Sequence, residues 1–255
     1  MSGLKGVRAM KWQIFPLVPS EMVIEMGRMT YLRNYGRALW LPCPFFILKG
    51  AEGVVMVDTS GPAEVMSKLR VEPVRDLMSF EEALASVDLA PEEISLVILT
   101  HLMYDHCANA KLLPKAKFVV QRAELEYAED PHPLFAGAYH AQLFRGLDFE
   151  VIEGDHRLMP GIQIIHTPGH SPGCQSVAVD TGAGTAVITG FCCVMDNFEP
   201  EGGSAWISDR SPEVIPPGIH LDVEEAYESA KRVKELADIV IPIHDPSLKT
   251  KGQIP

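Results

Sequence analysis

The chain has 255 residues, of which 47% are hydrophobic, and its formal net charge is −12 at pH 7. This charge and the lack of any basic block argue against a general nucleic-acid binder, because affinity for phosphate backbones rests on Lys and Arg. No apolar stretch reaches the ~18 residues that span a bilayer, residues 1–5 lack the apolar core of a signal peptide, and the five irregularly spaced cysteines do not suggest a disulfide framework. We therefore expect one cytoplasmic domain over residues 1–255, with neither membrane nor nucleic acid as a partner.

The first half of the chain predicts short strands separated by turns. Two apolar runs around a Gly-containing turn at residues 50–53 indicate a hairpin. A continuous apolar run further on is typical of a buried strand. Strands are predicted at 12–18, 45–49, 54–58 and 94–99, and helices at 80–88 and 109–113.

A dense group of potential metal ligands follows the predicted strand at 94–99. In an extended chain side chains alternate, so His101, Met103 and Asp105 share a face, and His106 joins them once the chain turns. Imidazole and carboxylate groups packed this closely are costly to desolvate unless a cation balances them. The sequence therefore predicts a metal site at the end of this strand.

The second half of the chain repeats strands and ends with a helix and one more strand. Residues 222–237 predict an amphipathic helix with Asp222 as its N-cap, since acidic residues occupy its first turn and basic residues come later. The apolar run at 239–243 then delivers His244 to the site. Further strands are predicted at 117–120, 149–152, 162–166, 175–180 and 185–189.

The ligand cluster resembles the His-x-His-x-Asp-His signature of the metallo-β-lactamase superfamily. Within that superfamily the chain is most similar to N-acyl homoserine lactonases. The resemblance implies an α/β fold, the αβ/βα four-layer sandwich in which two sheets lie between helices and the ligands occupy strand-end loops along one edge. Segments like the superfamily's other motifs lie at 55–61, 166–173 and 241–246, and segments like those of the lactonases lie at 118–124, 151–155 and 197–199.

The resemblance also implies two metal positions. Met103 stands where the family has a His, and a thioether is a poor ligand for hard or borderline cations. Phe191 stands where the family has the Asp that bridges two cations, which repel each other at about 3.5–4 Å without a bridge. We therefore expect one ion per chain, Zn²⁺ first, with Fe²⁺ or Mn²⁺ as alternatives. The first position would be His101, Met103 and His170, and the second Asp105, His106 and His244.

Sulfur offers an alternative to the missing bridge. Cys192 follows Phe191, and a one-residue adjustment of the turn would bring its thiolate, a strong Zn²⁺ ligand, to the metal. Met103 would then be a further soft ligand. Equally, Cys192 and Cys193 could simply end a buried strand, since free cysteine is commonly buried. Both interpretations stay open.

Some site residues are candidates for proton transfer and others for the substrate pocket. His101 and His170 are candidate general acid and base, unless they are vestigial. Val194 is nearest the place of the lactonases' catalytic Tyr, and Tyr104 inside the first motif could partly replace it. The predicted pocket residues are Phe191, Phe198 and Trp206, which favours an apolar or aromatic substrate unless these side chains are core or dimer contacts.

Three functions agree with these patterns. The first is a metal-dependent hydrolase that opens a lactone, ester or related acyl bond of a small molecule. The second is a divergent mononuclear metalloenzyme on the same scaffold, such as an Fe(II) oxygenase, lyase or isomerase. The third is a non-catalytic protein that binds a small molecule. The sequence favours the hydrolase and leaves open whether the chain forms a homodimer.

Overall fold

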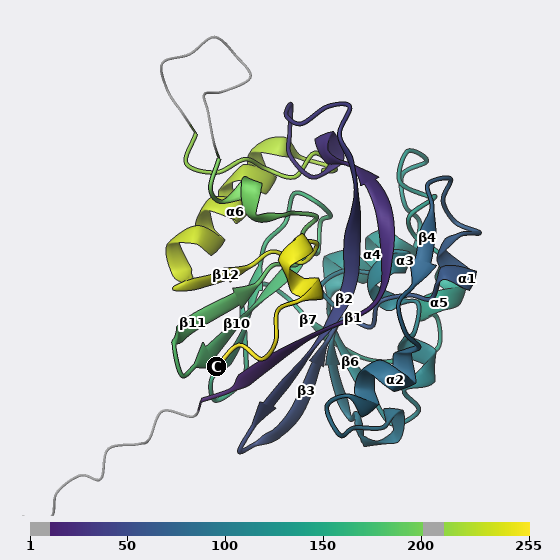
Figure 1. The fold of residues 1–255 in the computed structure, drawn as a ribbon, viewed down its shortest axis with the longest axis vertical. Coiled ribbons are helices and arrows are strands. Elements are labelled where there is room, and N and C mark those ends of the chain that lie inside the picture. Colours follow the sequence, from purple (N-terminus) through teal and green to yellow (C-terminus); the bar gives the residue numbers. More distant parts are fainter. Residues whose placement is uncertain (1–10, 201–211) are drawn as a thin grey trace, which may run out of the picture.

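A computed structural model describes residues 11–200 and 212–255, and two β-sheets form its centre (Figure 1). The first sheet has the order β4-β1-β2-β3-β5-β6-β7, and the second has the order β12-β11-β10-β9-β8. The first sheet contains β1 (Gln13–Glu25), β2 (Ala38–Gly50), β3 (Gly53–Val57), β4 (Val74–Asp76), β5 (Leu96–Ile98), β6 (Lys117–Gln121) and β7 (Asp148–Ile152). The second contains β8 (His156–Met159), β9 (Ile162–His166), β10 (Gln175–Thr181), β11 (Gly184–Ile188) and β12 (Ile239–Ile241).

Strand direction changes within each sheet. β1, β2 and β3 pair antiparallel, whereas β3, β5, β6 and β7 pair parallel. In the second sheet β8 to β11 pair antiparallel, and β12 joins β11 in parallel. Parallel neighbours end at the same edge, so the loops that follow β3, β5 and β6 open on one side of the first sheet.

Helices cover the outer face of each sheet, with α6 beside the second sheet and the shorter helices beside the first (Figure 1). One apolar cluster fills the space between the sheets, where Phe46 and Ile98 meet Ile164 and Val177. Separate clusters join each sheet to its helices. The helices are α1 (Ala63–Met66), α2 (Phe80–Ala85), α3 (Tyr104–Cys107), α4 (Arg122–Glu129), α5 (Ala141–Phe144) and α6 (Val223–Leu236). The helix–sheet–sheet–helix order confirms the predicted αβ/βα sandwich.

Several elements match their sequence patterns closely. α6 begins where predicted, because the Asp222 carboxylate accepts hydrogen bonds from the backbone of Glu224 and Glu225. α2 follows a capping box between Ser79 and Glu82.

No helix in the described ranges is both long and apolar enough to cross a membrane.

Three local predictions need correction. β1 extends to Glu25, well beyond the predicted end, because it pairs with β2 along its length. The helix predicted at 109–113 is the shorter 3₁₀ helix η3 (Ala110–Leu112). The chain also turns earlier than the extended motif implied: α3 starts at Tyr104, so Asp105 lies on a helix. The turn is held because the carbonyl of His106 accepts a hydrogen bond from the Thr59 amide at 2.8 Å.

Candidate metal centre

The predicted donor side chains meet at one edge of the two sheets. His101 lies just beyond β5, and Asp105 and His106 follow on α3. His170 lies in the loop after β9, and His244 lies beyond β12. All five are at least nine-tenths buried, so residues far apart in sequence form one buried group of imidazoles and a carboxylate.

Asp105, His106 and His244 form the tighter part of this group. Their ligand atoms all lie within 4.8 Å of one another. Asp105 Oδ2 is 3.5 Å from His106 Nε2 and 3.9 Å from His244 Nε2. Ligands of a tetrahedral Zn²⁺ stand about 3.3–3.5 Å apart, given metal–ligand distances of about 2.0–2.2 Å. Nε2 of His244 is buried and has no hydrogen-bond partner in the described part of the chain, so these residues fit a cation.

His101 and His170 form a second pair beside this set. Their Nε2 atoms are 3.3 Å apart, and their rings meet edge to face at 4.8 Å between centroids. The ring of His101 also lies 4.0 Å from that of His106. The two groups of donors therefore adjoin.

Hydrogen bonds on the far side of each ring fix which nitrogen faces the site. Nδ1 of His106 donates to Asp58 Oδ2 at 2.7 Å, and Nδ1 of His170 donates to the Ile219 carbonyl at 2.7 Å. Nδ1 of His244 donates to the Pro42 carbonyl at 2.9 Å. Since carbonyl and carboxylate oxygens only accept, each Nδ1 carries a hydrogen, and in the neutral ring each Nε2 then presents a lone pair, as a metal-ligating His requires.

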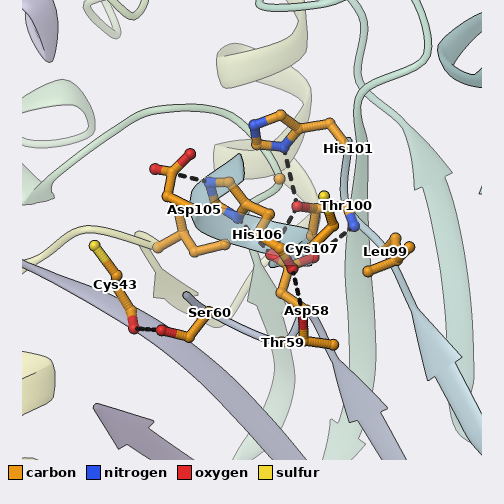
Figure 2. A network of polar contacts seen from close by, with 12 residues as sticks. Cys43, Asp58, Thr59, Ser60, Leu99, Thr100, His101, Asp105, His106 and Cys107 are labelled. Carbon is orange, nitrogen blue, oxygen red and sulfur yellow. Dashed lines mark hydrogen bonds and ion pairs between the residues drawn. The ribbon is translucent and has the colours of Figure 1, made fainter. Parts of the chain in front are cut away.

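Nδ1 of His101 also carries its hydrogen, because of its contact with the Thr100 hydroxyl (Figure 2). The Thr100 hydroxyl donates to Asp58 Oδ2 at 2.8 Å, so it accepts from His101 Nδ1 at 3.1 Å. Nε2 of His101 then carries a lone pair, which points at the lone pair on Nε2 of His170. Two such lone pairs at 3.3 Å repel each other unless a positive charge lies between them.

Burial and neighbouring charges set the protonation of these groups. Burial lowers the pKa of His170 and of His244 to about 4 and lowers that of His101 as well. Burial also opposes the charged form of His106, but the carboxylates of Asp105 and Asp58 outweigh it and raise the pKa of His106. His101, His170 and His244 are therefore neutral near pH 7 and available as ligands.

A cavity of about 360 Å³ opens onto the donor group. His101, Asp105, His106 and His170 line it together with two further residues named by the sequence, Met103 and Tyr104. Cys192 lines it too, with its Sγ 3.7 Å from Met29 Sδ, whereas Cys193 lies against Thr189 Oγ1 at 3.0 Å. Every predicted ligand except His244 therefore lines this cavity, and His244 lies directly behind Asp105, 3.9 Å from its Oδ2.

The predicted pocket residues lie elsewhere. Phe191 and Phe198 are almost fully buried between the second sheet and α6, with ring centroids 6.2 Å apart, and neither lines the cavity. The loop after β11 directs Phe191 into the cluster with α6 and Cys192 toward the cavity, so Cys192 and not Phe191 lines it. Trp206 lies outside the described residues.

Glu124 on α4 is a site residue to which the sequence assigned no role. Its buried carboxylate accepts hydrogen bonds from the Leu102 amide at 2.9 Å, the Ser171 hydroxyl at 2.5 Å and the Tyr139 hydroxyl at 3.2 Å. The loops that carry His101 and His170 are therefore joined through one side chain. The only available signal was its place in a lactonase-like segment.

Comparison with known proteins shows the family of this chain. A model of the metallo-β-lactamase superfamily matches residues 38–237. An N-acyl homoserine lactonase of a Bacillus species is 30% identical over 214 residues, 79% of this chain and 78% of the relative. The lactonase AttM of Rhizobium radiobacter is 25% identical over 256 residues, covering 92% and 93%.

Comparison with solved structures also finds lactonases of this fold. AiiA of B. thuringiensis, a mutant with N-decanoyl-L-homoserine at its active site, has a TM-score of 0.75 at 25% identity, covering 95% of this chain and 96% of that one. The dizinc lactonase AidC, at 15% identity and a TM-score of 0.66 over 96% and 91%, supports the fold. The matched family model, these relatives and the shared fold together show that the chain belongs to the metallo-β-lactamase superfamily.

Proposed function

We propose that this protein is a metal-dependent hydrolase that opens the acyl bond of a lactone or ester of a small molecule. The relatives support the hydrolase class, since those matched here are N-acyl homoserine lactonases. The observation that carries the proposal is the set of Nε2 lone pairs around one carboxylate, each fixed by a hydrogen bond at Nδ1 and directed at one another beside a cavity.

Asp105, His106 and His244 would hold the better-defined cation. The His101–His170 pair supplies a weaker second position, because Met103 offers a thioether where a third imidazole would bind hard cations better. A divalent cation here supplies Lewis-acid polarisation of the acyl carbonyl and lowers the pKa of water. Without a second ion, His101 and His170 serve as the proton-transfer groups that the sequence also allowed.

Three further residues complete the proposed site. Tyr104 lines the cavity and keeps its phenolic proton near pH 7, because burial raises its pKa, so it donates a hydrogen bond to the developing oxyanion. Glu124 holds the loop that carries His101 next to the loop that carries His170 through its hydrogen bonds to both. Cys192 lies at the cavity wall as a candidate extra ligand.

The test is hydrolysis by the chelator-stripped protein after addition of Zn²⁺, Mn²⁺ or Fe²⁺ under nitrogen. The substrates are N-hexanoyl-L-homoserine lactone and phenyl acetate, and proton release is followed at constant pH. We expect metal-dependent turnover that His244→Ala lowers by about three orders of magnitude, because Lewis-acid catalysis contributes several kcal/mol. His156→Ala, on the edge strand β8, is the matched control. Full activity without metal would contradict the proposal.

A second candidate rests on the same donor set. Two imidazoles and one carboxylate also suit Fe(II) enzymes that activate oxygen. Oxygen consumption with Fe²⁺, together with failure of Zn²⁺ to support turnover, would favour such a divergent enzyme. Ligand binding without any turnover would favour a binding protein.

A further inference from the structure

The cavity that meets the donor group also carries two arginines. Arg28 ends the 3₁₀ helix η1 (Met26–Arg28), and Arg70 lies between α1 and β4. Both pair with the single carboxylate of Glu72, Arg28 at 2.7 Å and Arg70 at 3.2 Å. Two guanidinium groups share one carboxylate, so this part of the wall has an excess of positive charge.

Arg70 is the unusual member because it is buried yet incompletely paired. Its side chain is 4% exposed. Its Nη2 donates to the Val23 carbonyl at 2.6 Å and to Glu72. Its Nε is buried with no hydrogen-bond partner among residues 11–200 and 212–255. A buried guanidinium that shares one carboxylate is costly, and a second anionic group in the cavity beside Arg70 would lower that cost.

The backbone of Arg28 is held at a fixed position relative to His170. The Ile219 amide donates to the Arg28 carbonyl at 3.0 Å, and the Ile219 carbonyl accepts from His170 Nδ1 at 2.7 Å. Gly218 packs so tightly that an added Cβ would lie 1.8 Å from the Gly27 carbonyl oxygen. The backbone that bears Arg28 is thus held at a set position from the donor group, as a preorganised binding site requires.

Apolar side chains complete the wall of this cavity. They include Met22, Ile24, Leu69, Leu134 and Phe135. A ligand that fills the cavity would contact metal ligands, arginines and apolar side chains. A volume of about 360 Å³ suits a small molecule.

We propose that the substrate is a lactone or ester whose far end carries a carboxylate, bound by Arg70 and Arg28. This inference rests on the proposed hydrolase function and narrows the apolar substrate that the sequence favoured to an amphiphilic acid. Arginine matches a carboxylate with paired, charge-assisted hydrogen bonds. Glu72 leaves donors of both guanidinium groups free, because it contacts Nη1 of Arg28 and Nη2 of Arg70.

The test compares adipate with hexanoate, which share chain length and one carboxylate but differ in the second carboxylate. Binding to the metal-loaded protein is measured by titration calorimetry. We expect adipate to bind about 10- to 100-fold more tightly, the value of a hydrogen-bonded charge pair. Arg70→Met should remove this preference, and Glu72→Gln should increase it because the competing carboxylate is gone. Arg157→Met on β8 is the matched control and should leave the preference unchanged.

Arg28→Met keeps the test decisive if Arg70→Met does not fold, since Arg28 is 42% exposed and its loss should lower the preference several-fold. Equal binding of adipate and hexanoate by the wild-type protein would overturn the inference. So would a preference that neither Arg28→Met nor Glu72→Gln alters.

Hydrolysis of monomethyl adipate and methyl hexanoate separates this inference from the function on which it rests. An Arg70-dependent preference for adipate without hydrolysis of either ester would leave the carboxylate site standing and reject the hydrolase. Equal hydrolysis of both esters, with no preference for adipate, would reject the carboxylate site and leave the hydrolase standing.

Discussion

Asp58 shows how one residue can order a whole ligand group. Its carboxylate accepts hydrogen bonds from the Thr100 amide at 2.7 Å, the Thr100 hydroxyl at 2.8 Å and His106 Nδ1 at 2.7 Å. Its backbone is in the left-handed region, with φ of 58°. That conformation costs roughly 1–2 kcal/mol for a residue other than Gly, and these three contacts offset the cost.

Asp58→Asn should weaken metal binding by about 10- to 100-fold, the usual effect of losing a carboxylate behind a ligating His. An amide cannot accept all three hydrogen bonds without turning a donor toward one of its neighbours. Competition with a chromophoric chelator measures the affinity. Asp88→Asn is the matched control, because Asp88 has a φ of 57° on an exposed loop. Unchanged affinity in Asp58→Asn would show that His106 needs no such support.

The sequence predicted the donors but could not predict what surrounds them. His101, Asp105, His106, His170 and His244 follow predicted strands in a known order, so parallel strand ends bring them together. The contact between Asp58 and His106 spans 48 residues and depends on how α3 turns back to β3. Whether Phe191 or Cys192 faces the cavity depends on the turn after β11, which no local pattern specifies.

At the scale of elements, α4 connects the two loops that carry imidazoles. Glu124 accepts hydrogen bonds from both loops, and Gly173 approaches it so closely that an added Cβ would lie 2.1 Å from the Glu124 amide nitrogen. The arrangement requires a carboxylate on the helix and a glycine in the loop. It makes α4 a support of the metal centre as well as a cover of the first sheet.

Glu124→Gln should lower the free energy of unfolding by about 1–3 kcal/mol, because the amide nitrogen would face a donor and leave a buried group unpaired. Urea unfolding of the metal-free protein measures this change, so that altered metal affinity does not contribute. Glu126→Gln, on the exposed face of the same helix, should be neutral. Equal stability of the two variants would contradict the proposed linkage.

Glu21 ties three elements together and gives stability a pH dependence. This β1 carboxylate pairs with Arg75 on β4 and with Lys249 of the 3₁₀ helix η5 (Pro246–Lys249). Burial alone would raise the pKa of Glu21, but the hydrogen bonds from Lys249 and Arg75 outweigh it and lower the pKa.

A lowered folded-state pKa stabilises the protein above the unfolded value of about 4.3, and this contribution disappears as pH falls through the folded value. Glu21→Gln should therefore be less stable than the wild type at pH 7, with a difference that narrows below about pH 4. Urea unfolding of both metal-free proteins across pH 3–7 measures it. A difference that stays constant with pH would contradict the argument.

Elements with strong periodicity were predictable, and the shortest helices were not. The alternation of apolar runs gave the hairpin of β2 and β3, and the charge pattern gave α6. α3 covers four residues, too few to show a helical period, so its start at Tyr104 could not be anticipated. The length of β1 depends on its partner β2, which lies elsewhere in the chain.

For the whole molecule, the main feature is that the donors come from both sheets. His101, Asp105 and His106 belong to the first sheet and its loop, whereas His170 and His244 follow strands of the second. A bound cation would therefore connect the two layers. The layer order itself was predictable from the resemblance to the superfamily, together with the strands that recur along the chain and the helix at 222–237.

Removal of the metal should lower the melting temperature substantially. At a metal concentration a thousandfold above Kd, binding contributes about 4 kcal/mol, which corresponds to roughly 8–15 °C for a chain of this size. Calorimetry with and without chelator measures the shift. His244→Ala should melt at nearly the same temperature in both conditions. If the melting temperature of the wild-type protein is the same with and without chelator, no ion binds these donors.

The position of β12 has a consequence for the order of assembly. His244 follows β12, which pairs with β11 in the second sheet, and it lies beside Asp105 of the first half of the chain. During synthesis, residues 101–170 would leave the ribosome with an incomplete ligand set. We therefore expect the large apolar core to guide folding, and a cation would bind to a nearly complete protein, unlike the zinc of small domains that fold only around their metal.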